Sequence, residues 1–284
     1  MSYNTKKEMW LPVSLYCAKC EWGEMITKVI KPYLQNLFQD KRLLHFRFQI
    51  DNEGGENIRL AMLVKSDTAE CIAKESDDYF KACFVNKQSQ NVVRFQPARE
   101  LFMRFPPNII CYGLYQIDEA SSGISNYDDF QTEFSKLLIE GLGAGEMNDF
   151  KILLIAFRFY LSLLITIWKV VDVKFEDLMC IQFHFTKIKN VMIDVGSVKN
   201  RFDENKWGMY NISYNIMKQS ENQPFFMLRW VELCKNKIIA VKDAGPEAAR
   251  SVFNEISLII DRQLDISESV KYEIYSLVKK VTTI

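Results

Sequence analysis

Hydrophobic and polar residues alternate most regularly between residues 43 and 65. In each of two runs every second residue is apolar, which is the period of a β-strand with one buried face. The apolar faces consist of Leu44, Phe46, Phe48 and Ile50 in the first run and Ile58, Leu60, Met62 and Val64 in the second. The intervening sequence DNEGGE is rich in turn-forming residues, and its glycines permit positive φ. The pattern therefore predicts a β-hairpin.

The other face of this hairpin carries His45, Arg47, Asn57 and Arg59. An arginine on a rigid sheet can hold a carboxylate or a phosphate, because its guanidinium group presents a planar fork of donors. Two interpretations stay open for this face. It is either an anion-binding surface or an ordinary solvated face whose charges only interact with water.

The elements around the hairpin predict a ferredoxin-like lobe. An extended stretch covers residues 9–17, and a helical pattern covers residues 21–38, with Pro32 expected to kink or break it. A second helix is expected from Ser66 to about Phe84, followed by extended stretches at 91–96 and 109–116. The order β-α-β-β-α-β is that of a split βαβ arrangement, an antiparallel sheet with helices on one face. We expect this α+β lobe to span residues 1–122.

Helical periodicity replaces strand alternation after residue 126. Helices are expected at residues 127–140, 147–171, 175–192, 205–218, 225–237, 246–264 and 267–281. The fold class predicted from the sequence is therefore α+β, a ferredoxin-like antiparallel sheet lobe followed by a mostly helical lobe. The helical lobe would span residues 123–284 and pack with the first lobe as one unit.

Composition and charge exclude several classes of partner. The most apolar stretch, residues 152–168, is shorter than the ~20 residues of a membrane span and contains Arg158, so a buried helix is expected. The formal net charge is zero, which gives no general attraction to nucleic acid or to an anionic membrane. Seven cysteines and the lack of an apolar segment at the N-terminus predict reduced thiols in the cytoplasm.

Common cofactor and metal motifs do not occur in the sequence. Cys17 and Cys20 form a lone CxxC without the second pair that a zinc site needs, and no glycine-rich phosphate loop occurs. We therefore expect no metal and no cofactor. Of the two histidines, His184 lies between phenylalanines and is typical of a packed core. His45 is the better candidate for a base, because it shares a strand face with cations.

A second polar cluster lies between the predicted hairpin and the helical lobe. It consists of Arg94, Arg99, Glu100 and Arg104. Glu100 and Arg104 are four residues apart, so one helical turn would place them on the same side. The cluster is either a surface ion pair or a clamp that holds a substrate over the polar face of the hairpin.

Four short motifs occur in an order and spacing that resemble one known family. Trp10 and Tyr16 match its first strand. His45-Phe46-Arg47-Phe48 and Asn57-Ile58-Arg59-Leu60-Ala61 match the family's F-I-R-Y and H-I-R-L-R. Phe95-Gln96-Pro97 begins its third motif, and residues 257–267 match its C-terminal motif. The chain thus resembles the thiopeptide-type bacteriocin biosynthesis domain, the C-terminal glutamate-elimination domain of class I lantibiotic dehydratases, which also occurs as a stand-alone protein.

The resemblance implies β-elimination on a precursor peptide whose Ser or Thr carries a glutamyl ester. By this analogy Arg47 and Arg59 bind glutamate carboxylate, Arg104 assists, and His45 is the base, with Asn57 and Glu100 also contacting substrate. The implied partners are the precursor peptide and a separate glutamyl-tRNA-dependent dehydratase subunit, and a homodimer is compatible with the family. No direct nucleic-acid contact is implied.

Departures from the family pattern keep two other functions open. Ala61 replaces a family arginine, Asn57 replaces a histidine, Ala98 replaces a glutamate, and the C-terminal histidine is absent. The pyridine synthases of thiopeptide biosynthesis use the same fold for a cyclisation between two dehydroalanines. The chain is thus expected to eliminate glutamate, to catalyse such a cyclisation, or to bind a precursor peptide without catalysis.

Overall fold

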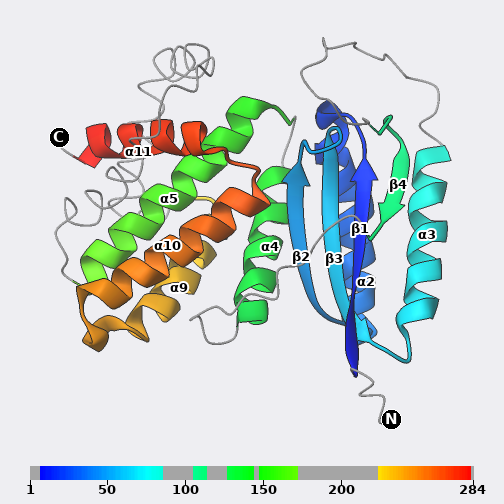
Figure 1. The fold of residues 1–284 in the computed structure, drawn as a ribbon, viewed down its shortest axis with the longest axis horizontal. Helices are drawn as coiled ribbons and strands as arrows, with labels where there is room; N and C mark the ends of the chain where they lie inside the picture. The colour runs from blue at the N-terminus through cyan, green and yellow to red at the C-terminus, as the bar shows by residue number, and fades with distance from the viewer. Residues whose placement is uncertain (1–6, 86–104, 114–126, 144–146, 172–222, 283–284) are drawn as a thin grey trace. The chain divides into compact units, whose positions relative to one another are not determined.

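The computed structural model describes residues 7–85, 105–113, 127–143, 147–171 and 223–282 (Figure 1). The chain divides into two compact units, Met1–Ser121 with Tyr127–Asn148, and Ser122–Asn126 with Asp149–Ile284. The predicted strand at 91–96, the predicted helices at 175–192 and 205–218, and His184 lie outside the described residues. Each unit is considered by itself below.

The first unit is built on a four-stranded antiparallel sheet in the order β2-β3-β1-β4. Its strands are β1 (Glu8–Tyr16), β2 (Leu43–Asp51), β3 (Asn57–Lys65) and β4 (Ile109–Tyr112). The hairpin of β2 and β3 has the predicted bounds, and β3 lies between β1 and β2, as a split βαβ arrangement requires. The predicted fold class is therefore confirmed.

The helical segment after β1 changes its winding next to Pro32. It consists of η1 (Lys19–Glu21), α1 (Trp22–Glu24), the π-helical η2 (Met25–Ile30) and α2 (Lys31–Gln39). Proline has no N–H group, so the carbonyl of Lys28 lacks its usual α-helical donor. At the end of η2, the N–H of Lys31 bonds to the carbonyl of Ile26, one residue further back than in an α-helix. The expected irregularity at Pro32 is thus a widened turn.

The apolar face of the sheet packs against helices. In Figure 1, α2 passes behind the strands and α3 (Ala69–Val85) lies beside β4. Phe48, Ile58 and Leu60 on this face are completely buried. The two helices are joined by a hydrogen bond of 2.7 Å between the hydroxyls of Tyr33 and Ser76. This helix layer leaves the polar face of the hairpin on the opposite side of the sheet.

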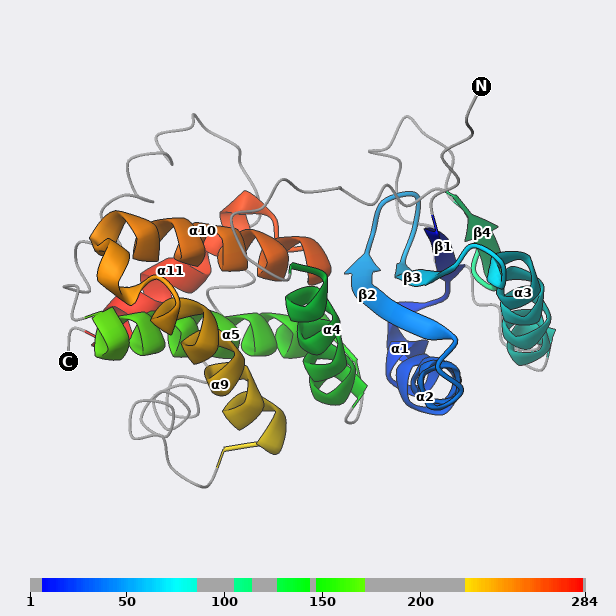
Figure 2. The ribbon, with the colours of Figure 1, turned by 90° about the horizontal axis from the view of Figure 1, so that it is seen from below.

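Helix α4 (Tyr127–Gly143) packs against β2 and belongs to the first unit (Figure 2). Its hydroxyls accept backbone hydrogen bonds from this strand, Thr132 from the N–H of Phe46 at 3.2 Å and Ser135 from the N–H of Phe48 at 3.0 Å. The sequence pattern grouped this helix with those that follow. The difference arises because the partners of α4 are hydroxyls that satisfy backbone groups, and helical periodicity does not show to which sheet a helix packs.

The second unit is helical and centred on α5 (Asp149–Val171). Around it pack α9 (Phe225–Ile239), α10 (Pro246–Gln263) and α11 (Glu268–Thr282), and the short η4 (Lys242–Ala244) precedes α10. By length and composition α5 is the one helix among the described residues that could cross a membrane, and 78% of its apolar window is buried inside the protein. Its burial agrees with the expected core helix.

A polar cluster lies within this apolar unit. The Tyr160 hydroxyl of α5 donates a hydrogen bond to the Asp261 carboxylate of α10, and Lys271 Nζ of α11 lies 2.5 Å from Asp261 Oδ2. Burial raises the pKa of Asp261, although the charge of Lys271 and the bond from Tyr160 oppose this effect. The cluster therefore joins three helices through one carboxylate.

Candidate functional site

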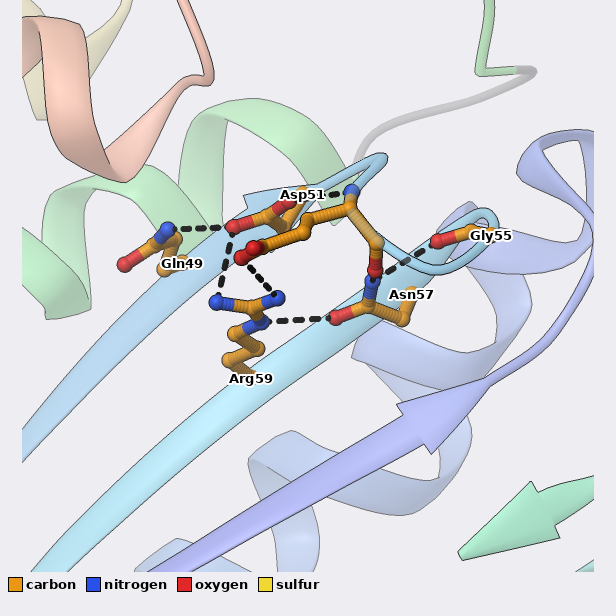
Figure 3. Close-up of polar contacts among 6 residues, drawn as sticks. Gln49, Asp51, Gly55, Asn57 and Arg59 are labelled. Carbon is orange, nitrogen blue, oxygen red and sulfur yellow. Dashed lines mark hydrogen bonds and ion pairs between the residues drawn. The ribbon is translucent and has the colours of Figure 1, made fainter. Parts of the chain in front are cut away.

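The guanidinium group of Arg59 is the centre of a polar cluster at the tip of the hairpin (Figure 3). Its Nη1 lies 3.1 Å from Asp51 Oδ2, and its Nη2 lies 3.0 Å from Glu53 Oε2. Its Nε donates to Asn57 Oδ1 at 3.1 Å. The Arg59 side chain is 9% exposed. The nearly buried guanidinium thus pairs with two carboxylates of its own hairpin.

The turn between β2 and β3 positions the acidic partners. Asp51 Oδ1 accepts a hydrogen bond from the Glu53 N–H at 2.6 Å, and Gln49 Nε2 donates to Asp51 Oδ2 at 2.8 Å. Asn57 Nδ2 donates to the carbonyls of Gly55 at 2.7 Å and Glu53 at 3.1 Å. Figure 3 shows Asp51 and Asn57 pointing towards Arg59, and Gln49 pointing towards Asp51. Asn57 thus links the turn to Arg59, and its expected contact with substrate stays a prediction.

Tyr16 lies under the turn and was not predicted as a site residue. Its ring lies 4.7 Å from that of Phe105, centroid to centroid. Both residues lie beside Gly54, where an added Cβ would be 3.3 Å from Phe105 Cδ2 and from the Tyr16 hydroxyl oxygen. Burial raises the pKa of the Tyr16 phenol, and the charge of Arg59 opposes this rise. The phenol is therefore protonated at neutral pH and can donate a hydrogen bond. The sequence signal for it was the first-strand motif of Trp10 and Tyr16, and the register pairs Tyr16 with Asn57.

His45 and Arg47 lie towards the other end of β2 and contact α4 instead. Arg47 Nη2 donates to Asp128 Oδ1 at 2.8 Å, and its guanidinium carbon lies 4.7 Å from the centre of the Trp10 ring. His45 Nδ1 lies 3.7 Å from Asp129 Oδ1. The Arg47 side chain is 7% exposed, so this cation fastens a helix to the sheet.

The structure does not bring His45 next to Arg59. Arg59 pairs in register with Gln49, which is four positions from His45, or about 13 Å along the strand. The ion pairs of His45 and Arg47 are with α4 and those of Arg59 are with the turn, and a joint role of the three side chains stays a prediction. The interpretation of a purely solvated face does not hold for the arginines either, because both are buried against carboxylates.

The second predicted cluster, Arg94, Arg99, Glu100 and Arg104, lies outside the described residues. Within the ranges given above, no group of three His, Cys, Asp or Glu side chains is arranged to hold a metal ion. Cys17 is buried and Cys20 is exposed, and neither forms a disulfide.

Comparisons with known proteins show similarity in fold to several solved structures. No protein-family model matches the sequence. No curated protein matches it. Among solved structures, the chain is similar to the pyridine synthase TbtD from thiomuracin biosynthesis, with a TM-score of 0.63 and 10% identity over 96% of this chain and 97% of that one. It is similar to TsrL, with a TM-score of 0.64 and 10% identity over 97% of this chain and 94% of that one.

A third similar structure is the tRNA-dependent lantibiotic dehydratase MibB from Microbispora sp. 107891, with a TM-score of 0.60 and 10% identity. It covers 99% of this chain, which in turn spans 28% of that longer protein. At such identities the likeness concerns the fold. The chain therefore has the fold found in proteins of thiopeptide and lantibiotic biosynthesis.

Proposed function

We propose that this chain acts on a ribosomally made precursor peptide and eliminates glutamate from its glutamylated Ser or Thr residues. The observation that carries the proposal is the Arg59 site, which already holds a glutamate side chain at 3.0 Å. The fold supports the same function, because a dehydratase and a pyridine synthase are among the similar structures.

The proposed reaction is a redox-neutral β-elimination. A base removes the α-proton of the esterified Ser or Thr, and the freed electron pair forms the Cα=Cβ double bond. The Cβ–O bond breaks, and glutamate leaves as a carboxylate with the bonding electrons. Cations and hydrogen-bond donors accelerate such a step where they meet developing negative charge.

Two residues have roles in this proposal. Arg59 binds the side-chain carboxylate of the glutamyl group, and Tyr16 donates a hydrogen bond to the departing ester oxygen. An extended glutamyl serine spans about 9 Å from that carboxylate to the serine Cα. Arg47 is paired with Asp128 and His45 lies beside Asp129, and the roles expected for His45 as the base and for Arg47 as a second carboxylate-binding group stay predictions. The assistance expected from Arg104 stays a prediction.

A second candidate is cyclisation between two dehydroalanines. One observation favours it, namely that the similarity to the pyridine synthase extends over 97% of that protein. Its substrates are neutral at the reacting groups, so it would not need a cation that binds a carboxylate.

The test is to incubate the chain with a synthetic peptide that carries one O-glutamyl serine and to follow the products by mass spectrometry. Release of glutamate together with a dehydroalanine peptide supports elimination. A parallel reaction with a peptide containing two dehydroalanines tests cyclisation through release of the leader. Binding of either peptide without conversion contradicts both enzymatic functions and indicates a binding subunit.

A further inference from the structure

We propose that Glu53 is an internal placeholder for the side-chain carboxylate of the substrate, which binds by displacing Glu53 from Arg59. The inference rests on the proposed function, because it takes a glutamylated peptide as the substrate. Its basis is chemical identity, since the group that now accepts the hydrogen bond of Arg59 Nη2 is itself a glutamate side chain.

The two acidic partners of Arg59 differ in how firmly they are held. The Asp51 side chain is 10% exposed, whereas that of Glu53 is 82% exposed. Asp51 also accepts hydrogen bonds from the Gln49 amide and the Glu53 N–H. In the described part of the chain, the Glu53 carboxylate forms its ion pair with Arg59. An incoming anion therefore competes with Glu53, while Asp51 stays as the fixed partner.

The backbone of the turn allows the exchange without refolding. The Glu53 N–H is held by Asp51 Oδ1, and its carbonyl accepts from Asn57 Nδ2 at 3.1 Å. The side chain can consequently rotate into water while its backbone keeps its place. Because the Glu53 side chain is 82% exposed, its carboxylate is solvated when it leaves Arg59, and Asp51 remains beside the guanidinium.

The arrangement also predicts which acyl groups the site accepts. Arg59 Nη2 requires an acceptor that carries negative charge to replace the charge it loses. A glutamyl group meets this requirement, and a glutaminyl group of the same shape does not. The placeholder thus makes the site selective for an acid, because a neutral group that displaces Glu53 does not supply the negative charge that Arg59 loses.

The experiment measures the binding of free glutamate by isothermal titration calorimetry to the full chain and to two matched variants. Glu53→Gln keeps the shape of the turn and removes the competing charge. Glu56→Gln is the control, since Glu56 lies in the same turn but accepts from the Lys19 N–H at 2.6 Å. We expect glutamate to bind about threefold to tenfold more tightly to Glu53→Gln, and unchanged to Glu56→Gln. Adding Arg59→Gln to Glu53→Gln should abolish the binding.

The outcomes separate the inference from the proposed function. If wild-type protein eliminates glutamate and Glu53→Gln shows the same affinity and the same KM, the placeholder is overturned and the function stands. If Glu53→Gln binds glutamate more tightly but no variant eliminates it from a glutamylated peptide, the placeholder stands and the function fails. Absence of glutamate binding in every variant also overturns the placeholder.

Discussion

Arg59 is the residue on which the candidate site depends, because it is buried and paired with two carboxylates at once. Its partners Asp51, Glu53 and Asn57 all lie within eight residues of it in the sequence. The site therefore forms as soon as the hairpin forms. Arg59 has two roles: it neutralises Asp51, and in our proposal it binds the substrate.

Replacing Arg59 should consequently affect stability and activity together. We expect Arg59→Ala to lower kcat/KM for the glutamylated peptide by a factor equivalent to about 2–4 kcal/mol. It should also lower the free energy of unfolding by about 1–3 kcal/mol, because Asp51 loses its cation in a nearly buried position. Steady-state kinetics and urea unfolding measure the two effects.

Arg42→Ala is the matched control, since Arg42 forms a more exposed ion pair with Glu75 at 2.6 Å in the same unit. It should change the free energy of unfolding by at most about 1 kcal/mol and leave kcat/KM unaltered. Full turnover by Arg59→Ala would contradict the proposed role of Arg59.

The Tyr16 hydroxyl should matter for turnover and little for folding. Tyr16→Phe keeps the ring that packs on Phe105 and removes the donor, so we expect kcat to fall about 100-fold with an unchanged melting temperature. Tyr33→Phe is the comparison, because the Tyr33 hydroxyl is also buried but bonds to Ser76 between two helices. That variant should lose stability and keep its kcat. The reverse result would make Tyr16 a structural residue.

At the scale of elements, the contact of α4 with β2 depends on hydroxyl groups. Thr132 and Ser135 each accept a backbone N–H of the strand, and Arg47 adds an ion pair to Asp128. These groups replace the hydrogen bonds that a neighbouring strand would supply.

Removing one hydroxyl should leave a strand amide without its acceptor. We expect Ser135→Ala to destabilise the first unit by about 1–3 kcal/mol and to speed hydrogen exchange at the Phe48 amide. Ser162→Ala is the control, since Ser162 is equally buried but bonds to a carbonyl of its own helix, that of Arg158 at 2.7 Å. Equal exchange at Phe48 in both variants would show that the hydroxyl contributes nothing to the contact.

The sequence predicted elements well and distant partners poorly. Alternation from Leu44 to Ile50 fixed the strand bounds, because one face of β2 packs on helices and the pattern is local. The pairing of Arg47 with Asp128 joins residues 81 positions apart, and no periodicity reports such a contact. The partners of Arg59 could have been predicted, because Asp51 and Glu53 lie in the neighbouring turn of the sequence.

At the scale of the whole molecule, the two units are stabilised differently. The first has a sheet with polar residues on one face, and the second has an apolar core around α5, interrupted by the cluster of Tyr160, Asp261 and Lys271. A buried carboxylate of this kind makes the stability of the second unit depend on pH.

The direction of this dependence follows from the raised pKa of Asp261, which burial moves above its ordinary value of 3.8. Between the two values the folded state holds the proton that the unfolded chain has released. Stability from this group is therefore lost as the pH rises through the window above 3.8. Asp261→Asn should remove this part of the pH dependence, as measured by urea unfolding from pH 4 to pH 7. The exposed Asp243→Asn should leave it intact, and identical profiles for wild type and Asp261→Asn would contradict the assignment.

The hydroxyls of α4 also limit where a bound peptide can lie on the first unit. The outward amides of Phe46 and Phe48 are already taken by Ser and Thr side chains, so the margin of the sheet at β2 offers these donors to no other chain. An extended peptide cannot pair with this edge of the sheet as a fifth strand unless α4 moves away from β2. A precursor peptide that reaches the hairpin tip must therefore arrive by another route than strand pairing along β2.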